Sequence, residues 1–275
     1  MLKIAVCQLP LDVEKPVEFN VALAREAILR ACALGAKLIV LPELSNSGYV
    51  FRNKEEAISR TTTLDGAIIQ GWMEMAAQEK ITLVAGINLL VDGEVRNSSV
   101  IIDESGLRGH YFKAHLWNNE LDIFTPGDQP PLVVDTQFGK LATMVCYDLE
   151  FTEWVRLAML EDAVVMALPT NWPSSGLPAS PTALEAVRVQ AAASQNKMVV
   201  AAADRCRDER GVVWSSASVI ADSDGVIRAI ADLSVGAQIQ VIVADVEIPT
   251  DRKLSPRNDA RTDRRIHLYG DSLRP

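Results

Sequence analysis

The chain of 275 residues carries a net charge of −9 and has an isoelectric point near 4.9, which disfavours a nucleic-acid backbone or an anionic membrane as its partner. Hydrophobic residues make up 48% of the sequence and charged residues 23%, a balance that is typical of soluble globular proteins and argues against disorder. The length allows one or two domains, and large α/β folds of this size commonly form one.

Alternating apolar strands and amphipathic helices are predicted through the first half of the chain. Residues 37–42 complete a βαβ-like unit, and the turns Asp92-Gly93 and Ser105-Gly106 favour hairpins further on. The predicted elements are strand 2–9, helix 16–35, strand 37–42, helix 66–78, and strands 82–91, 95–103 and 107–113.

The second half repeats the alternation without a composition break, so we expect one α/β domain built from two similar halves. Its predicted elements are strand 141–146, helix 152–161, strand 163–168, helix 179–195, and strands 198–203, 213–221, 226–230 and 238–246. The main domain is expected to span residues 1–250. The polar tail, 251–275, is rich in arginine and is either a solvated terminus or an arm that contacts a partner subunit.

The compartment and the metal content are predicted from absent signals. No apolar run approaches the roughly 18 residues of a membrane span, and the first residues do not read as a secretory signal. The four cysteines, Cys7, Cys32, Cys146 and Cys206, form no CxxC pair, so neither a zinc site nor a disulfide framework is expected. We therefore expect a cytoplasmic protein with no metal site.

Cys146 alone among the cysteines lies where an apolar strand meets the start of an acidic helix, in Thr143-Met-Val-Cys146-Tyr-Asp. A helix N-terminus favours negative charge and lowers the pKa of a thiol, so this position favours a nucleophilic thiolate. The alternative is a buried cysteine that packs as a small hydrophobic residue.

A catalytic base other than histidine is expected, because none of the three histidines lies in an obvious partnering motif. Glu43 follows an apolar strand, where open α/β sheets place their sites, and an apolar pocket would raise the pKa of its carboxyl towards neutrality. Lys113 also follows a strand, and its ammonium group could stabilise a thiolate and an oxyanion. Taken singly, Glu43 could be a surface turn acid and Lys113 an exposed lysine.

Together these motifs resemble those of the nitrilase superfamily of carbon-nitrogen hydrolases, which carry a Glu-Lys-Cys triad in this order. The matching segments cover nearly the whole chain. They are Leu-Pro-Glu43 with Gly48-Tyr49, Tyr-Phe-Lys113-Ala-His-Leu, Cys146-Tyr-Asp-Leu-Glu-Phe-Thr-Glu-Trp-Val-Arg156, Leu-Pro-Thr-Asn171-Trp172, and the helix from Glu185 to Asn196.

The resemblance implies a single-domain α-β-β-α sandwich that pairs with a second subunit into a longer layered core, and it implies no metal or organic cofactor. It further implies that Glu43 is the general base, that Cys146 attacks the carbonyl carbon, and that Lys113 stabilises the intermediate together with the backbone N–H of Tyr147. A thioester would form as ammonia leaves, and water activated by Glu43 would hydrolyse it.

Further site residues follow from the same resemblance. Related amidases carry a second glutamate that positions the substrate, and Glu120 lies at the matching place. The alternative is that Glu120 is a loop carboxylate, with Asp122 as a neighbouring candidate. Tyr49, Asn171 and Trp172 are expected to line the pocket, although Trp172 could be core packing. Other charged residues near these motifs, namely Glu150, Glu153, Arg156, Glu185 and Arg188, could be only helix caps or surface pairs. For Glu185 and Arg188 the resemblance implies the alternative that their stretch lies close to the site.

The residues after the cysteine, Tyr147-Asp148, resemble those of the amidase branch, so we expect hydrolysis of a small aliphatic primary amide. The likeness is greatest to bacterial aliphatic amidases, ω-amidases and 5-aminopentanamidase-like enzymes. A nitrilase, an N-carbamoyl amide hydrolase, or a catalytically idle binding relative are the alternatives. Asp204 stands where relatives often have Asn, and an extra carboxylate near the pocket would favour an amide that bears an amine.

Overall fold

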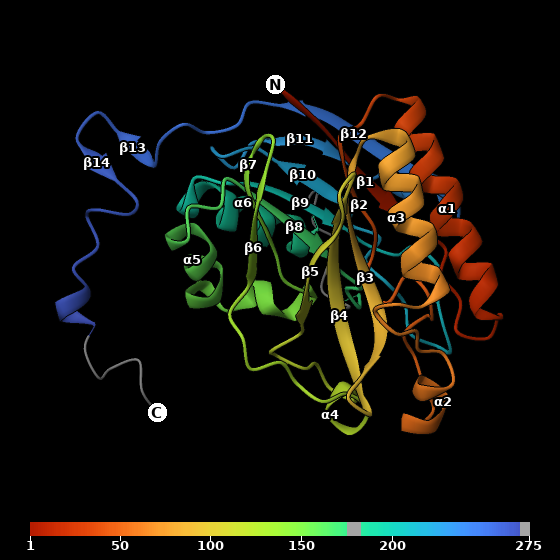
Figure 1. The fold of residues 1–275 in the computed structure, drawn as a ribbon. Coiled ribbons are helices and arrows are strands. Elements are labelled where there is room, and N and C mark those ends of the chain that lie inside the picture. Colours follow the sequence, from red (N-terminus) through yellow and green to blue (C-terminus); the bar gives the residue numbers. More distant parts are fainter. Residues whose placement is uncertain (175–182, 270–275) are drawn as a thin grey trace.

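The computed structural model describes residues 1–174 and 183–269 and consists of two six-stranded sheets packed face to face between two pairs of helices (Figure 1). This α-β-β-α sandwich, formed by one domain, is the fold class that the sequence predicts. Helices α1, Val17–Ala33, and α3, Ala67–Glu79, cover one sheet, while α5, Thr152–Leu160, and α6, Leu184–Asn196, cover the other.

The first sheet has the strand order β12-β1-β2-β3-β4-β5, and the second has the order β11-β10-β9-β8-β7-β6. Each sheet contains three parallel neighbours, β1, β2 and β3 in one and β7, β8 and β9 in the other. The strands of the first sheet are β1 Leu2–Gln8, β2 Leu38–Val40, β3 Thr82–Val91, β4 Glu94–Asp103, β5 Gly106–Phe112 and β12 Gln240–Val246. Those of the second are β6 Leu132–Thr136, β7 Gly139–Thr143, β8 Val165–Pro169, β9 Val199–Ala203, β10 Val219–Ala221 and β11 Ile227–Ile230.

Both faces of the central strands are buried, which explains why these strands read as continuous apolar runs. In β1, Ile4 and Val6 belong to the core between the two sheets, whereas Ala5 and Cys7 belong to the core under α1 and α3. This alternation follows from the two-residue period of a strand. The two sheets therefore share one apolar layer and hold their strand ends in a fixed relation.

Several short elements were not predicted, and one strand was predicted too long. Helices α2, Lys54–Ile58, and α4, Glu120–Ile123, contain about one turn each, too short for a periodic pattern. Strand β6 is a half-buried edge strand that follows two prolines. Strand β10 covers only the end of the predicted strand 213–221. The predicted helix 179–195 begins at Leu184 in the described chain, and residues 179–182 lie outside the described residues.

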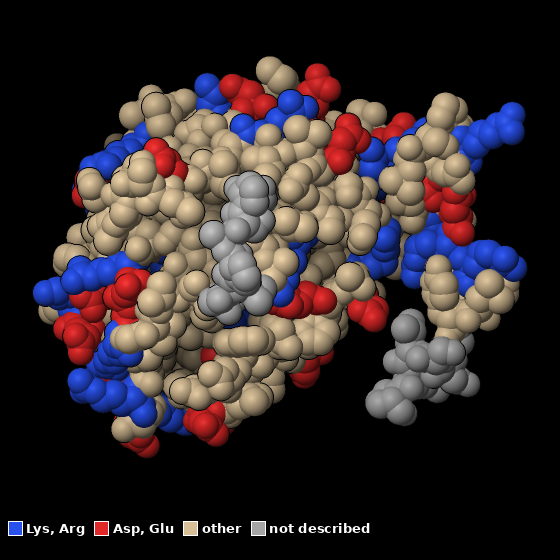
Figure 2. Space-filling model, turned by 180° about the vertical axis from the view of Figure 1, so that it is seen from behind, with Lys and Arg blue, Asp and Glu red and all other residues tan. Residues whose placement is uncertain are grey.

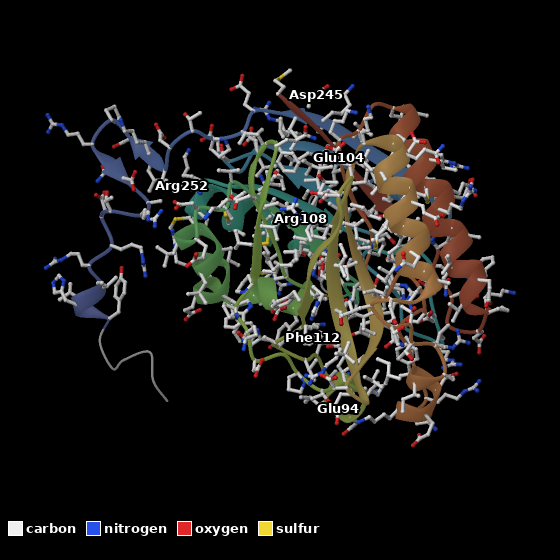
Figure 3. The ribbon with its side chains drawn as sticks, in the orientation of Figure 1. Glu94, Glu104, Arg108, Phe112, Asp245 and Arg252 are labelled. Atoms are coloured by element: carbon white, nitrogen blue, oxygen red, sulfur yellow. The ribbon has the colours of Figure 1, made fainter. Side chains whose placement is uncertain are left out.

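The tail leaves the sandwich after β12 and stands away from it (Figures 1 and 2). Its first part is anchored to its own domain: Arg252, labelled in Figure 3, is buried and donates hydrogen bonds to the backbone carbonyls of Ala163 and Lys197. The tail also contains β13, Lys253–Ser255, and β14, Asn258–Asp259. The contact with a partner subunit remains a prediction, and residues 270–275 are not described. No described helix is both long and apolar enough to cross a membrane.

Candidate active site

Glu43 lies just beyond the carboxyl end of β2, between the two sheets. Its backbone N–H donates to the carbonyl of Thr170, which follows β8, at 3.3 Å, and its own carbonyl accepts a hydrogen bond of 2.8 Å from the side chain of Asn171. The Glu43 side chain is fully buried, and its Oε2 atom has no hydrogen-bond partner among the described residues. The site thus begins where the strand ends of the two sheets meet.

Gly86 in β3 allows the backbone of Glu43 to approach this closely. A Cβ atom at position 86 would lie 2.4 Å from the Glu43 Cα and 2.5 Å from the Pro42 carbonyl oxygen, so Gly86→Ala should destabilise the fold by about 3 kcal/mol and displace Glu43. Urea unfolding measures this loss. Gly71→Ala in α3 is the control, because nothing surrounds that position and alanine favours a helix; equal stability of the two variants would contradict the account.

Lys113 follows directly after β5, whose last residue, Phe112, is labelled in Figure 3. The Lys113 side chain is fully buried, and its Nζ lies 2.7 Å from Glu43 Oε1 and 2.8 Å from Glu120 Oε2. Glu120 is the first residue of α4 and also accepts a hydrogen bond of 2.7 Å from the backbone N–H of Trp117. A buried ammonium group therefore sits between two buried carboxylates, so that one positive charge faces two acidic groups.

Asn97 in β4 completes this cluster and was missed by the sequence analysis. Its Nδ2 donates to Glu43 Oε1 at 2.6 Å and to Glu120 Oε1 at 3.0 Å, while its backbone carbonyl accepts a bond of 2.8 Å from the Lys113 N–H. The signal in the sequence is the polar triplet Asn97-Ser98-Ser99, which directly precedes the apolar run Val100-Ile101-Ile102 in the same strand. A buried polar side chain needs hydrogen-bond partners, and Glu43 and Glu120 are the partners of the Asn97 side chain.

Cys146 begins a 3-10 turn, Cys146–Glu150, three residues after β7, and its φ of 49° is in the left-handed region. Its sulfur lies 3.7 Å from the carbonyl oxygen of Asn171. Burial raises the pKa of the Cys146 thiol well above its usual value, and the negative charge of Glu43 acts in the same direction. The predicted lowering of this pKa by a helix start is therefore wrong: the turn is short, and loss of hydration dominates.

Asp148 joins the turn that carries Cys146 to the chain that follows Lys113. Its buried carboxylate accepts hydrogen bonds from the backbone N–H of Val145 at 3.1 Å, from the Tyr111 hydroxyl at 2.8 Å and from the backbone N–H of His115 at 3.0 Å. These bonds fix two segments from different sheets against each other. The nucleophile turn and Lys113 are consequently held in one rigid unit.

The electrostatics of the cluster suit proton transfer near neutrality. Burial raises the pKa of the Glu43 carboxyl to about 7 against the opposing charge of Lys113, and the charge of Glu120 adds to the rise. Burial alone would lower the pKa of Lys113, but the charges of Glu120 and Glu43 raise it well above its usual value. The pKa of the Tyr49 hydroxyl is also raised, by burial and then by the charges of Glu120 and Glu43. Lys113 thus remains an ammonium group beside a titratable carboxylate.

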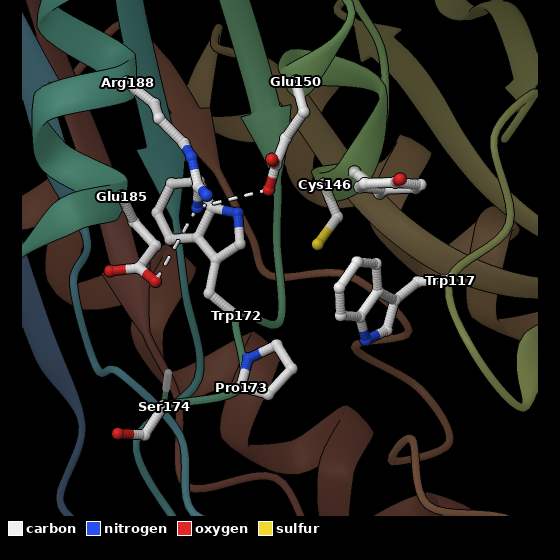
Figure 4. A pocket seen from close by; sticks show the side chains of 9 residues that line it. Trp117, Cys146, Glu150, Trp172, Pro173, Ser174, Glu185 and Arg188 are labelled. Carbon is white, nitrogen blue, oxygen red and sulfur yellow. Dashed lines mark ion pairs between the residues drawn. The ribbon is translucent and has the colours of Figure 1, made fainter. Parts of the chain in front are cut away.

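Two adjoining cavities lie at the site, one against Cys146 and one against Glu120, and Trp117 and Pro173 line both. The first, of about 220 Å³, contains the Cys146 sulfur (Figure 4). Its described lining residues are Trp117, Cys146, Tyr147, Glu150, Trp172, Pro173, Ser174, Glu185 and Arg188. The second, of about 270 Å³, is lined in part by Tyr49 and Glu120. Tyr49 thus lines the second cavity, and Tyr147 and Trp172 line the first.

Two other expectations differ from the structure, and one alternative that the sequence left open is decided by it. Asn171 lines neither cavity, because its side chain is turned towards the Glu43 backbone. Glu185 and Arg188 are not a surface pair, since both line the Cys146 cavity. Asp204 is not a pocket carboxylate: it is fully buried and accepts backbone N–H bonds of 3.0, 2.9 and 2.9 Å from Trp172, Arg205 and Ala217. Asp204 thus anchors the loop that carries Trp172.

Glu209 supports the segment that carries Tyr49. The sequence analysis missed it, because in the sequence it is only one acidic residue of a charged loop. Its carboxylate accepts backbone N–H bonds from Tyr49 at 2.9 Å and from Val13 and Val50. Arg205, which is fully buried, pairs with Glu209 at 3.0 Å.

Among the described residues, no group of three His, Cys, Asp or Glu side chains could hold a metal ion.

Comparison with known proteins matches residues 3–252 to the family model described as carbon-nitrogen hydrolase. The chain is 32% identical to a protein named nitrilase from Pyrococcus abyssi, over 98% of this chain and 99% of that one. It is 28% identical to an (R)-stereoselective amidase from Pseudomonas sp, over 92% of this chain and 88% of that one.

Solved structures of an amidase from Nesterenkonia sp. AN1 share the fold. One of them is 26% identical and has a TM-score of 0.80, covering 99% of this chain and 100% of that one. Others at 25% identity show that amidase with acrylamide added at its active-site cysteine, or in complex with butyramide. The motifs, the fold and these matches agree, and the chain belongs to the carbon-nitrogen hydrolase family of the nitrilase superfamily, whose amidase members it matches in sequence and in structure.

Proposed function

We propose that the protein hydrolyses a small aliphatic primary amide to the carboxylic acid and ammonia through a thioester on Cys146. The observation that carries the proposal is the buried Glu43–Lys113–Glu120 cluster, with contacts of 2.7 and 2.8 Å, next to a thiol that opens into a cavity. The charge of Glu43 is near enough to Cys146 to raise the pKa of its thiol. Acid, amine and sulfur thus share one site.

Acylation begins with a neutral thiol, because the pKa of Cys146 is raised, so the nucleophile needs a base. Glu43 takes the thiol proton through its free Oε2 as the sulfur attacks the carbonyl carbon. The oxyanion is stabilised by the ammonium group of Lys113 and by the backbone N–H of Tyr147. Glu43 then returns the proton to the nitrogen, and ammonia leaves as the C–N bond breaks.

Deacylation uses the same groups in a second cycle. Glu43 takes a proton from a water molecule, which attacks the thioester carbonyl, and the C–S bond breaks with return of the proton to sulfur. Glu120 and Asn97 hold Lys113 and Glu43 in position through both cycles. One base with a pKa near 7 serves both half-reactions, because it can accept and release a proton at neutral pH.

A small aliphatic substrate fits the size and walls of the two cavities, of about 220 and 270 Å³, which are smaller than most drug-sized sites. The amidase relative that binds butyramide supports the same class. Nitrile hydrolysis is the second candidate, because the Pyrococcus abyssi relative is named a nitrilase. The same nucleophile, base and ammonium group would serve a thioimidate.

Ammonia release from a matched set of compounds tests the proposal. Purified protein is offered propionamide, butyramide, propionitrile and an N-carbamoyl amine, and ammonia is measured over time. We expect turnover of the two amides. Turnover of the nitrile alone would establish the second candidate instead, turnover of the carbamoyl compound alone would assign another branch, and no turnover of any compound would favour an idle binding relative.

The pH profile should report the ionisation of Glu43. Because the carboxylate form accepts the proton and the pKa is about 7, kcat/KM for propionamide should rise about tenfold per pH unit below pH 7 and level off above it. Burial also raises the pKa of Asp204 to about 7, so Asp204→Asn is the control. If Glu43 is the titrating group, this variant should keep the rise of kcat/KM below pH 7. A rate independent of pH from 5 to 8 would contradict the assignment of Glu43 as base.

Glu120→Gln should lower kcat/KM for propionamide by about 100-fold, because loss of its charge weakens the hold on Lys113. Cys146 should still react with iodoacetamide, as judged by the mass of the modified protein. Asp122→Asn is the matched control, since Asp122 is exposed on the same short helix. Equal kinetics for both variants would make Glu120 an ordinary loop carboxylate.

A further inference from the structure

The Cys146 cavity is lined on one side by charged residues together with Trp172 and on the other by Trp117 (Figure 4). Trp117, Tyr147 and Trp172 supply the rings, and Tyr147 and Trp117 pack edge to face with centroids 4.8 Å apart. The charged side is formed by Glu150, from the turn that carries the nucleophile, and by two residues of α6 described next. None of these charged groups takes part in the proposed chemistry.

Glu185 and Arg188 come from the first turns of α6. The Arg188 Nη1 lies 3.2 Å from Glu150 Oε1 and 4.0 Å from Glu185 Oε1. Glu185 is only 5% exposed, and the side chains of Glu150 and Arg188 are about one-third exposed. The charged side chains among the described lining residues therefore carry two negative charges and one positive charge, and Arg188 is already engaged by both carboxylates.

We infer that this cavity selects amides whose acyl chain ends in an ammonium group, with Glu150 and Glu185 as the residues that determine specificity. The inference rests on the proposed amide hydrolysis at Cys146. A cation on the acyl chain would meet an excess carboxylate and three aromatic rings, whose faces attract ammonium groups. The net charge of −9 on the whole chain acts in the same direction during encounter.

An anionic acyl chain meets the opposite conditions. To pair with Arg188 it must displace Glu150 at 3.2 Å and then remain beside two carboxylates, which repel it. A neutral chain gains contact with the rings but gains nothing from the carboxylates. The cavity of about 220 Å³ has room for about seven waters at ~30 Å³ each, which suits a short chain.

Three amides of similar size test the inference on the wild-type protein: 4-aminobutanamide, pentanamide and succinamate, which carry a positive, a neutral and a negative end. We expect kcat/KM to be highest for 4-aminobutanamide, by about tenfold over pentanamide, and lowest for succinamate. Equal values for the cationic and neutral amides, or a preference for succinamate, would overturn the inference.

Variants of the charged residues test whether a preference for the cationic amide arises from the Cys146 cavity. In Glu150→Gln/Glu185→Gln, the ratio of kcat/KM for 4-aminobutanamide to that for pentanamide should fall by about tenfold, and in Arg188→Gln the ratio should rise. Glu153→Gln is the matched control, because Glu153 loses the same charge three residues from Glu150 but lines no part of this cavity. An unchanged ratio in the double variant would overturn the inference.

Failure of this inference and failure of the proposed function give different results. If none of the three amides nor propionamide is hydrolysed, the amidase proposal fails. If pentanamide is hydrolysed but neither preference nor variant effect appears, amide hydrolysis stands and the charge selection is wrong. Circular dichroism and alkylation of Cys146 establish that each variant is folded with an accessible site.

Discussion

Cys146→Ala is expected to lower kcat/KM for propionamide by at least about 10⁴-fold, because its thiol is the proposed nucleophile and alanine cannot form the acyl intermediate. The fold should survive, since the change removes one small side chain. Ammonia release measures the loss, and the urea midpoint should stay close to that of the wild type.

Cys32→Ala provides the control for Cys146→Ala. Cys32 is half-buried in α1 and lines neither cavity, so its loss should leave turnover intact. A Cys146→Ala protein that keeps wild-type activity would remove the nucleophile assignment. If Cys32→Ala were inactive although it unfolds at the same urea concentration as the wild type, loss of activity would not identify the nucleophile.

Glu43→Gln should cost about 10³-fold in kcat/KM, within the range for loss of a general base. The amide oxygen of glutamine can keep the contacts with Lys113 and Asn97 that Glu43 makes at 2.7 and 2.6 Å, so the geometry is retained while the basicity is lost. Burial of a neutral amide is also easier than burial of a carboxylate, and the variant should fold at least as stably as the wild type.

The pH dependence separates a lost base from a displaced one. Any residual activity of Glu43→Gln should lack the acidic limb near pH 7, because the group that titrates there is gone. Glu153→Gln again serves as the charge-matched control and should retain the limb. A Glu43→Gln protein with full activity and an unchanged limb would assign the base elsewhere.

The raised pKa of the Cys146 thiol indicates that the nucleophile is a neutral thiol before it reacts and not a pre-formed thiolate. A pre-formed thiolate would need a lowered pKa, whereas this thiol is buried next to a carboxylate. The ammonium group of Lys113 opposes the shift but does not overcome it. In the proposed mechanism deprotonation accompanies attack, and Glu43 suits this role because its Oε2 has no hydrogen-bond partner among the described residues.

Much of the site could be predicted because strand ends mark positions where side chains gather. Glu43, Lys113 and Cys146 each follow a strand directly or within three residues, and their order matches a known family. The same reasoning could not find Asn97, since its side chain leaves the middle of a hairpin strand, and the meeting of that strand with Glu120 depends on tertiary packing.

The burial and hydrogen-bond partners of the site residues were harder to predict from the sequence than their positions in the chain. The sequence does not show that the Cys146 turn is buried, and so the direction of its pKa shift was wrong. Asp204 reads as a charged loop residue, yet three backbone donors hold it inside the protein. Likewise, Glu185 and Arg188 fit a surface pair by spacing, and only the packing of α6 against the turn brings them to the cavity.

The thioester on Cys146 is tested most directly by acid-quenching the enzyme during propionamide turnover and mapping its peptides by mass spectrometry. The account predicts a propionyl group on the peptide that contains Cys146 and on no other cysteine. Steady ammonia release with the propionyl group on a different residue would contradict it.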